Sequence, residues 1–176
     1  MQSSIGDSCG SVQTAAIASP ATVLLPYSVA AVSGAATSVP LVLQTQGQAV
    51  SAFAATIVFD PAALQLDPTD ADGSGVPDAI HFQTPAGTLT LARYDPVAGR
   101  IDLIAAGIVS PLPLLADGTL ATVDFRRAGG AAGTPTTLRL ENLSLGSPAG
   151  TRVPVVTGEW MPSRGAASVF LPVLLR

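Results

Sequence analysis

The stretch from Val50 to Asp78 constrains the fold more strongly than any other part of the sequence. Residues 53 to 59 read FAATIVF, so that Phe53, Ile57 and Phe59 fall on one side of an extended chain and Thr56 and Val58 on the other. A period of two over this length is typical of a β-strand with one side in a core. The proline after Asp60 removes a backbone donor and ends the strand at a corner.

The composition favours strands throughout the rest of the chain. Its 176 residues include 17 glycines and 15 prolines, and 48% of all residues are hydrophobic. Among the 8 basic residues there is no lysine, a strong helix former. About nine strands with turn residues between them predict an all-β fold, a two-sheet sandwich. We expect the sandwich at residues 21–160, with flexible tails at 1–20 and 161–176.

The charge, the cysteine content and the apolar C-terminal segment limit the kinds of partner and attachment that the chain can have. The net charge is −4, and no basic cluster is larger than Arg126–Arg127, which argues against a nucleic-acid partner. The single cysteine, Cys9, cannot form a disulfide within the chain. The apolar end VFLPVLLR is too short to span a membrane, and is interpreted as an edge strand or a docking or sorting tail.

Residues 70–78, DADGSGVPD, follow the first nine positions of an EF-hand-type calcium loop. Oxygen ligands at positions 1, 3, 5, 7 and 9 surround the ion in such a loop, and a glycine at position 6 permits the bend. The predicted Ca²⁺ ligands are the Asp70, Asp72 and Asp78 carboxylates, the Ser74 hydroxyl and the Val76 carbonyl. The alternative is an ordinary surface turn, since Asp, Gly and Ser are also turn residues.

The calcium pattern departs from an EF-hand at its last position. His81 stands where a bidentate glutamate belongs, and imidazole is a poor calcium ligand. Asp67, three residues before the loop, could supply the missing carboxylate. The loop lies between predicted strands, so we expect any bound ion to be structural.

Three segments together resemble the cohesin domain of cellulosomal scaffolding proteins. They are VSAFAATIVFDPAALQL at 50–66, AGRIDLIAAG at 98–107 and DGTLATVDFRRAGGAAGTPTTLRLENLSL at 117–145, in the order of the family. The resemblance implies a nine-stranded jelly-roll whose function is to hold a dockerin module of another protein. The acid loop is a departure from the family pattern.

The resemblance also implies a binding surface. Cohesins hold dockerins on the outer face of one sheet, whose strands correspond to about 136–141, 51–59, 100–107 and 88–93 here. The implied partner-binding residues face outward from these strands: Thr56, Val58, Thr90, Asp102, Ile104 and Arg139. Such a mixture of apolar and hydrogen-bonding groups suits a protein interface.

Three other functions fit the sequence less well. Catalysis has little support, because His81 is the only histidine and no nucleophile motif accompanies it. A carbohydrate-binding module of the same jelly-roll type would need exposed aromatic rings for a polysaccharide, and Tyr27, Tyr94 and Trp160 are dispersed. A passive spacer domain has no positive signal. The sequence therefore predicts a non-catalytic, secreted or cell-surface module with a dockerin-type partner.

Overall fold

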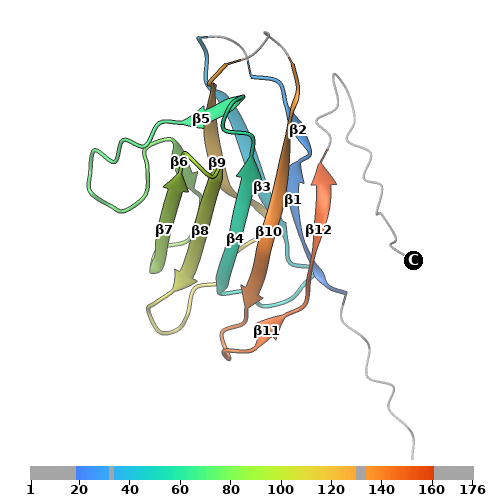
Figure 1. Ribbon diagram of the computed structural model, residues 1–176. Helices are drawn as coiled ribbons and strands as arrows, with labels where there is room; N and C mark the ends of the chain where they lie inside the picture. The colour runs from blue at the N-terminus through green and yellow to red at the C-terminus, as the bar shows by residue number, and fades with distance from the viewer. Residues whose placement is uncertain (1–18, 32–33, 130–133, 161–176) are drawn as a thin grey trace, which may run out of the picture.

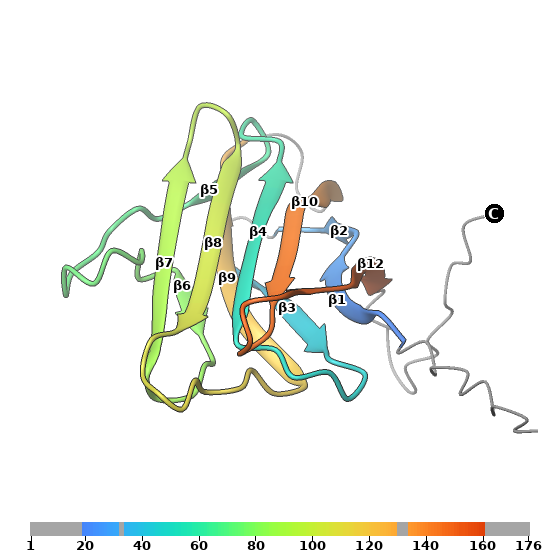
Figure 2. The same cartoon turned by 90° about the horizontal axis from the view of Figure 1, so that it is seen from below.

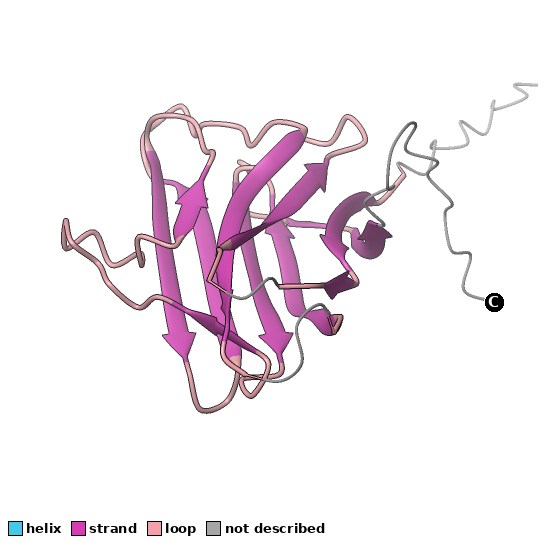
Figure 3. Ribbon diagram, turned by 90° about the horizontal axis from the view of Figure 1, so that it is seen from above, coloured by secondary structure: helices cyan, strands magenta, loops and turns pink. Residues whose placement is uncertain are grey.

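The computed structural model describes residues 19–31, 34–129 and 134–160, which form a sandwich of two β-sheets (Figure 1). The predicted tail residue Cys9 and the VFLPVLLR segment lie outside these ranges. Strands and loops account for all of the described chain, as Figure 3 shows by colour. No helix in these ranges is long and apolar enough to cross a membrane. The predicted all-β fold is confirmed.

The first sheet contains, in spatial order, β12 (Val155–Trp160), β1 (Ala21–Pro26), β3 (Thr37–Gln44), β9 (Gly118–Arg127) and β5 (Leu64–Leu66), and β6 (Ile80–Phe82) also pairs with β9. The second contains β11 (Arg152–Val153), β10 (Thr136–Gly146), β4 (Ala52–Phe59), β8 (Arg100–Gly107) and β7 (Thr88–Asp95), and β2 (Ser28–Val29) also pairs with β10. Seen from below, the two sheets form separate layers (Figure 2).

The strand count differs from the expected nine because the described chain also forms short strands. The described residues form twelve strands, and β2 and β11 contain two residues each. The backbone groups of such short pieces pair with β10 at its two ends. Sequence periodicity cannot reveal them, since alternation needs several residues to be visible.

The core lies between the sheets and follows the alternation of the sequence. The side chains of Phe53, Ile57 and Phe59 on β4 are all buried. Phe59 packs edge-on against Phe125 of the opposite sheet, with ring centroids 5.0 Å apart. Edge-to-face packing at this distance is a favourable arrangement of aromatic rings. The predicted core side of the central strand is therefore confirmed.

A β-bulge near Asn142 interrupts the pairing of β10 with β4. The pairing of β10 with β4 shifts between Glu141 and Ser144, and Asn142 has a φ of 52°. Asparagine tolerates this left-handed conformation better than most residues. The bulge keeps both halves of β10 in register with β4, and it holds Asn142 beside the outer surface of the sheet.

Candidate functional site

The solvent-facing side of the β10–β4–β8–β7 sheet is the candidate binding surface, called here the front face. The pairing of these four strands agrees with the order that the sequence resemblance implied. Thr56 pairs with Asp102 and with Glu141, and Val58 pairs with Arg100 and Arg139. Residues directly opposite each other in an antiparallel sheet share a face. Thr56, Val58, Asp102 and Arg139 thus lie together, and Ile104 follows on the same side of β8.

Thr90 is the exception, and the expectation that it faces outward is wrong. It pairs with Ala105, which is fully buried, and it shares the phase of Ala92 and Tyr94, which pack against the core. Leu89 and Leu91 face outward instead, and Leu91 pairs with Ile104. The sequence reasoning missed both leucines because leucine is usually assigned to the core side of a strand.

A small hydrogen-bond network occupies the middle of the front face. The Thr56 hydroxyl donates to Oδ1 of Asp102 at 2.7 Å and accepts from Nδ2 of Asn142 at 3.3 Å. Thr56 is only 3% exposed although it is on the outward side of β4. The network joins three neighbouring strands, and it fixes the positions of an exposed carboxylate and an exposed amide.

Charged and apolar residues separate along the front face. At one end, Arg100 lies 3.6 Å from Asp102, and Arg139 lies 3.6 Å from Glu141. At the other end, small residues of β4, β8 and β10 line a shallow depression: Ala52, Ala54, Ala106, Ser144 and Gly146. Ile104 borders this depression, and Leu89 and Leu91 continue the apolar end toward the edge of the sheet. One half of the face can offer hydrogen bonds, and the other can bury aliphatic groups.

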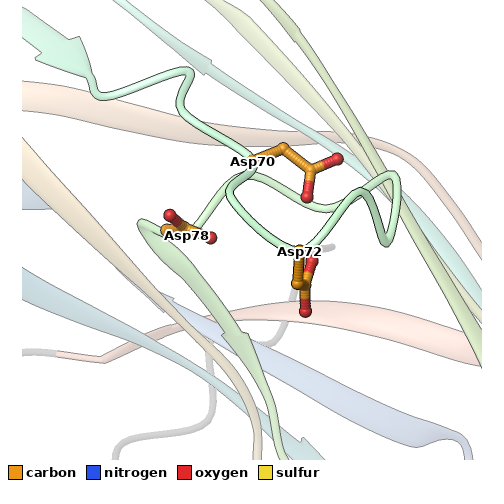
Figure 4. Close-up of side chains that lie close together, drawn as sticks. All are labelled: Asp70, Asp72 and Asp78. Carbon is orange, nitrogen blue, oxygen red and sulfur yellow. The ribbon is translucent and has the colours of Figure 1, made fainter.

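The acid loop gathers three of the predicted calcium ligands. One carboxylate oxygen from each of Asp70, Asp72 and Asp78 lies within 4.8 Å of the others (Figure 4). The loop is held by its own side chains: the Ser74 amide donates to Asp70 and Asp72 at 3.0 and 2.9 Å. Carboxylate and carbonyl oxygens are the ligands that Ca²⁺ prefers.

The other two predicted ligands are close to this cluster, and Asp67 has a different partner. The Ser74 hydroxyl is 3.4 Å from both Asp70 Oδ1 and the Val76 carbonyl oxygen. Asp67 lies 3.5 Å from Arg126. The structure does not group it with the three carboxylates.

Hydrogen bonds lower the pKa of two of these acids. The side chain and backbone of Ser74, followed by the Asp70 side chain, lower the pKa of Asp72. The Thr69 hydroxyl donates to Asp67 at 2.7 Å, and this bond is the largest cause that lowers the pKa of Asp67. The lowered pKa favours the ionised form of both carboxylates, which is the form that binds a cation.

His81 belongs to a different surface and has a structural partner. Its Nε2 lies 3.4 Å from Oδ2 of Asp124, and Oδ1 of Asp124 accepts a 2.6 Å hydrogen bond from Ser38. The carboxylate stands between the hydroxyl and the imidazole. A serine nucleophile needs the imidazole itself as its neighbour, so this trio does not have the arrangement of a catalytic triad.

Aromatic rings do not form a platform on the described surface. Among the described side chains, Tyr27 is the only aromatic one with a large exposed fraction. Tyr94 instead stacks on Phe59, with centroids 6.3 Å apart. Sugar-binding surfaces of jelly-roll modules stack sugars on rows of exposed rings. The described surface therefore gives no support to a polysaccharide partner.

The similarity of this chain to known proteins lies in its fold and not in its sequence. No family model matches the sequence, and no curated protein has a significantly similar sequence. Among solved structures, CaCohA2 of Clostridium acetobutylicum, in the CaDoc0917–CaCohA2 complex, aligns with a TM-score of 0.61 at 14% identity, over 78% of this chain and 94% of that one. A type I cohesin–dockerin complex of Clostridium thermocellum aligns at 0.60 and 14% identity, over 82% and 93%.

A third similar structure is the third ScaC cohesin of Acetivibrio cellulolyticus, solved with the ScaB dockerin. It aligns with a TM-score of 0.59 at 17% identity, over 78% of this chain and 93% of that one. All three alignments span nearly the whole cohesin chain and most of the sandwich described here. Despite the low identity, this chain has the cohesin fold.

Proposed function

We propose that the chain is a non-catalytic interaction module that holds a dockerin-type protein on its front face. The front face carries this proposal, because it combines an ordered polar centre with a shallow apolar depression on a rigid sheet. Two of the similar structures are cohesins solved together with dockerins. An extracellular or cell-surface location belongs to the same proposal, and so does the absence of catalysis.

The chemistry of the front face suits a protein partner better than a small ligand. The face offers broad contact area, with Ile104, Leu91 and Leu89 each more than 40% exposed. The polar half adds Asp102, whose Oδ1 is already positioned by Thr56. Interfaces between proteins combine apolar contact area with hydrogen-bonding groups. We expect the partner to place its apolar residues over the depression.

We also propose that the acid loop binds Ca²⁺ as a structural ion. The carboxylates of Asp70, Asp72 and Asp78 would hold it, with the Ser74 hydroxyl and the Val76 carbonyl as further oxygens. Three clustered carboxylates repel one another, and a divalent cation would remove that repulsion. The loop joins the first sheet to the edge of the second, since the Ala92 amide donates to the Gly75 carbonyl at 3.3 Å.

A capture experiment tests the main proposal. The immobilised chain is incubated with purified dockerin modules from its source organism, and with soluble polysaccharides in parallel. We expect dockerin capture by the wild-type chain and strong loss with Ile104→Arg, because this side chain is exposed on the front face and its replacement leaves the core intact. Val156→Arg on β12 of the other sheet is the matched control. Capture of polysaccharide alone, or equal capture by Ile104→Arg, would contradict the proposal.

A further inference from the structure

We propose that the loop at residues 108–114 extends the front face, and that its exposed aliphatic side chains select the partner. The inference rests on the proposed function, because the occupant is an apolar patch of the same dockerin-type module. The loop connects β8 with β9 and carries the sequence IVSPLPL. The side chains in question are those of Ile108, Val109 and Leu114, called here the aliphatic loop.

Exposed aliphatic side chains are concentrated at the apolar end of the front face and in the loop that follows β8. The described residues include nine large hydrophobic side chains with high exposure, and six of them belong to the apolar end of the front face or to the aliphatic loop: Leu89, Leu91, Ile104, Ile108, Val109 and Leu114. Single exposed hydrophobic residues need no explanation, whereas contiguous patches mark interaction sites. A protein partner is therefore expected to cover the apolar end of the front face and the aliphatic loop.

Backbone contacts place Ile108 and Val109, at the start of the aliphatic loop, next to the front face. Ile108 directly follows β8 and has the phase of Ile104 and Ala106, so it extends their outward row. Its amide donates to the Gly87 carbonyl at 2.9 Å, next to the start of β7. A Cβ atom built on Gly87 would lie 3.3 Å from Cβ of Val109, which places Val109 against the same turn. A partner seated on Ile104 and Leu89 would therefore also reach this loop.

The aliphatic loop is anchored at both ends. The Gly107 amide donates to the Ser51 carbonyl at 2.8 Å, and the Leu115 amide donates to the Val50 carbonyl at 2.7 Å. Leu115 itself is buried, and Pro113 packs closely against Gly107. The exposed side chains therefore stand on a backbone that is already ordered. Binding would require little further ordering of the loop, which favours affinity.

The polar half of the front face is less suited to selecting the partner. Its groups already interact with one another, as in the Thr56–Asp102 hydrogen bond and the Arg139–Glu141 pair. A partner must replace these interactions, so its net gain from new polar contacts is small. Burying exposed aliphatic groups against any complementary apolar surface contributes favourable binding free energy. Differences between partners should accordingly act through the apolar end.

The test measures dockerin affinity for single variants of the full chain by biolayer interferometry. The dockerin modules are those of the capture experiment. We expect Ile108→Asp and Leu114→Asp each to weaken binding about tenfold. Val97→Asp is the matched control, because Val97 is 89% exposed at the β7–β8 turn and lies at the opposite end of these strands. It should bind as the wild type does. Ile108→Ser repeats the test without an added charge.

Three other results would overturn the inference, and they differ in what they mean for the proposed function. If the wild-type chain binds dockerin and both loop variants bind equally well, the inference is overturned while the proposed function stands. If the wild-type chain binds no dockerin, both are overturned. If sedimentation shows a dimer that Ile108→Asp dissociates, a second copy of the chain occupies the loop, and the inference is again overturned.

Discussion

The hydroxyl of Thr56 donates a 2.7 Å hydrogen bond to the carboxylate of Asp102 on the neighbouring strand, in the middle of the front face. Thr56 faces outward by its phase in β4, yet it is among the few buried polar residues of the described chain. Asp102 covers it from one side, and Asn142, held in position by the β-bulge, bonds to it from the other. The buried Thr56 hydroxyl therefore fixes the positions of Asp102 and Asn142, and these two side chains are available to a partner.

Thr56→Val removes this hydroxyl without changing the shape of the side chain much. We expect a loss of stability of about 1 kcal/mol, because Asp102 and Asn142 lose a partner but can still bond to water. Urea denaturation measures the change. Thr122→Val, at a mid-strand position of β9 in the other sheet, controls for the higher strand propensity of valine. Equal stability of the two variants would show that the network contributes nothing.

Alternation in the sequence was sufficient to predict the core side of β4, and the resemblance to cohesins predicted the pairing of its sheet. Alternation assigned Phe53, Ile57 and Phe59 to the core, and all three are buried. Burial on one face leaves a strand only one register, because a slip by one residue reverses every side chain. The bulge at Asn142 was predictable for the same reason, since it restores the phase of leucines that would otherwise face water.

The phase of β7 could not be predicted in this way. This strand reads TLTLAR, and its leucines face water while Thr90 faces inward. β7 is the last strand of its sheet, where the inward side chains are only half-buried, so they tolerate a threonine. The partner of Asp67 was equally hidden, because its contact with Arg126 depends on how β5 pairs with β9. Contacts of this kind follow from tertiary structure.

A substitution at Gly99 tests whether close packing at the corner that ends β4 stabilises the fold. Its φ is +62°, and a Cβ atom would collide with the Phe59 carbonyl oxygen and lie 2.8 Å from Cδ of Pro61. We expect Gly99→Ala to destabilise the fold by about 2–4 kcal/mol. Gly47→Ala is the matched control, since Gly47 has a φ of +79° with nothing within 4 Å. It should cost only about 1 kcal/mol in the same chemical denaturation. Similar costs for both would show that the close approach at the corner is unimportant.

Asp117 should make the stability depend on acidity. Its Oδ1 accepts a 2.6 Å hydrogen bond from the Thr45 amide, and this bond is the main reason that its pKa is lowered. A carboxyl group whose pKa is lowered by folding stabilises the folded state at pH values above its pKa in the unfolded chain, which is about 4. This stabilisation is lost as the pH falls through the lower pKa of the folded state. We expect Asp117→Asn to be less stable than the wild type at neutral pH, with a difference that shrinks toward about pH 2. Glu159→Gln is the control for net charge in thermal melts across this range, and a difference independent of pH would refute the linkage.

Calcium should raise the melting temperature if the acid loop binds it. An ion that binds only the folded state stabilises it in proportion to the logarithm of its concentration above Kd. We expect a rise in Tm with added Ca²⁺, reversal by a chelator, and no response in Asp72→Ala. Asp95→Ala removes an acid outside the cluster and should keep the response. An identical melt of the wild type with calcium and with chelator would leave the loop as an ordinary surface turn.

Leu91 and Thr90 are neighbours on β7 that face opposite sides of the sheet, so substituting each by arginine tests both the register and the surface. Leu91 pairs with exposed Ile104, whereas Thr90 pairs with buried Ala105. We expect Leu91→Arg to weaken dockerin capture at least about tenfold with little change in stability, because it places a charge in an apolar contact. Thr90→Arg should instead destabilise the chain by about 1–3 kcal/mol, because it places a charge on the half-buried inner side. Capture assays and urea denaturation on the same two proteins give the answer. If Thr90→Arg lost capture at unchanged stability while Leu91→Arg unfolded the chain, β7 would have the opposite phase and the front face would have to be redrawn.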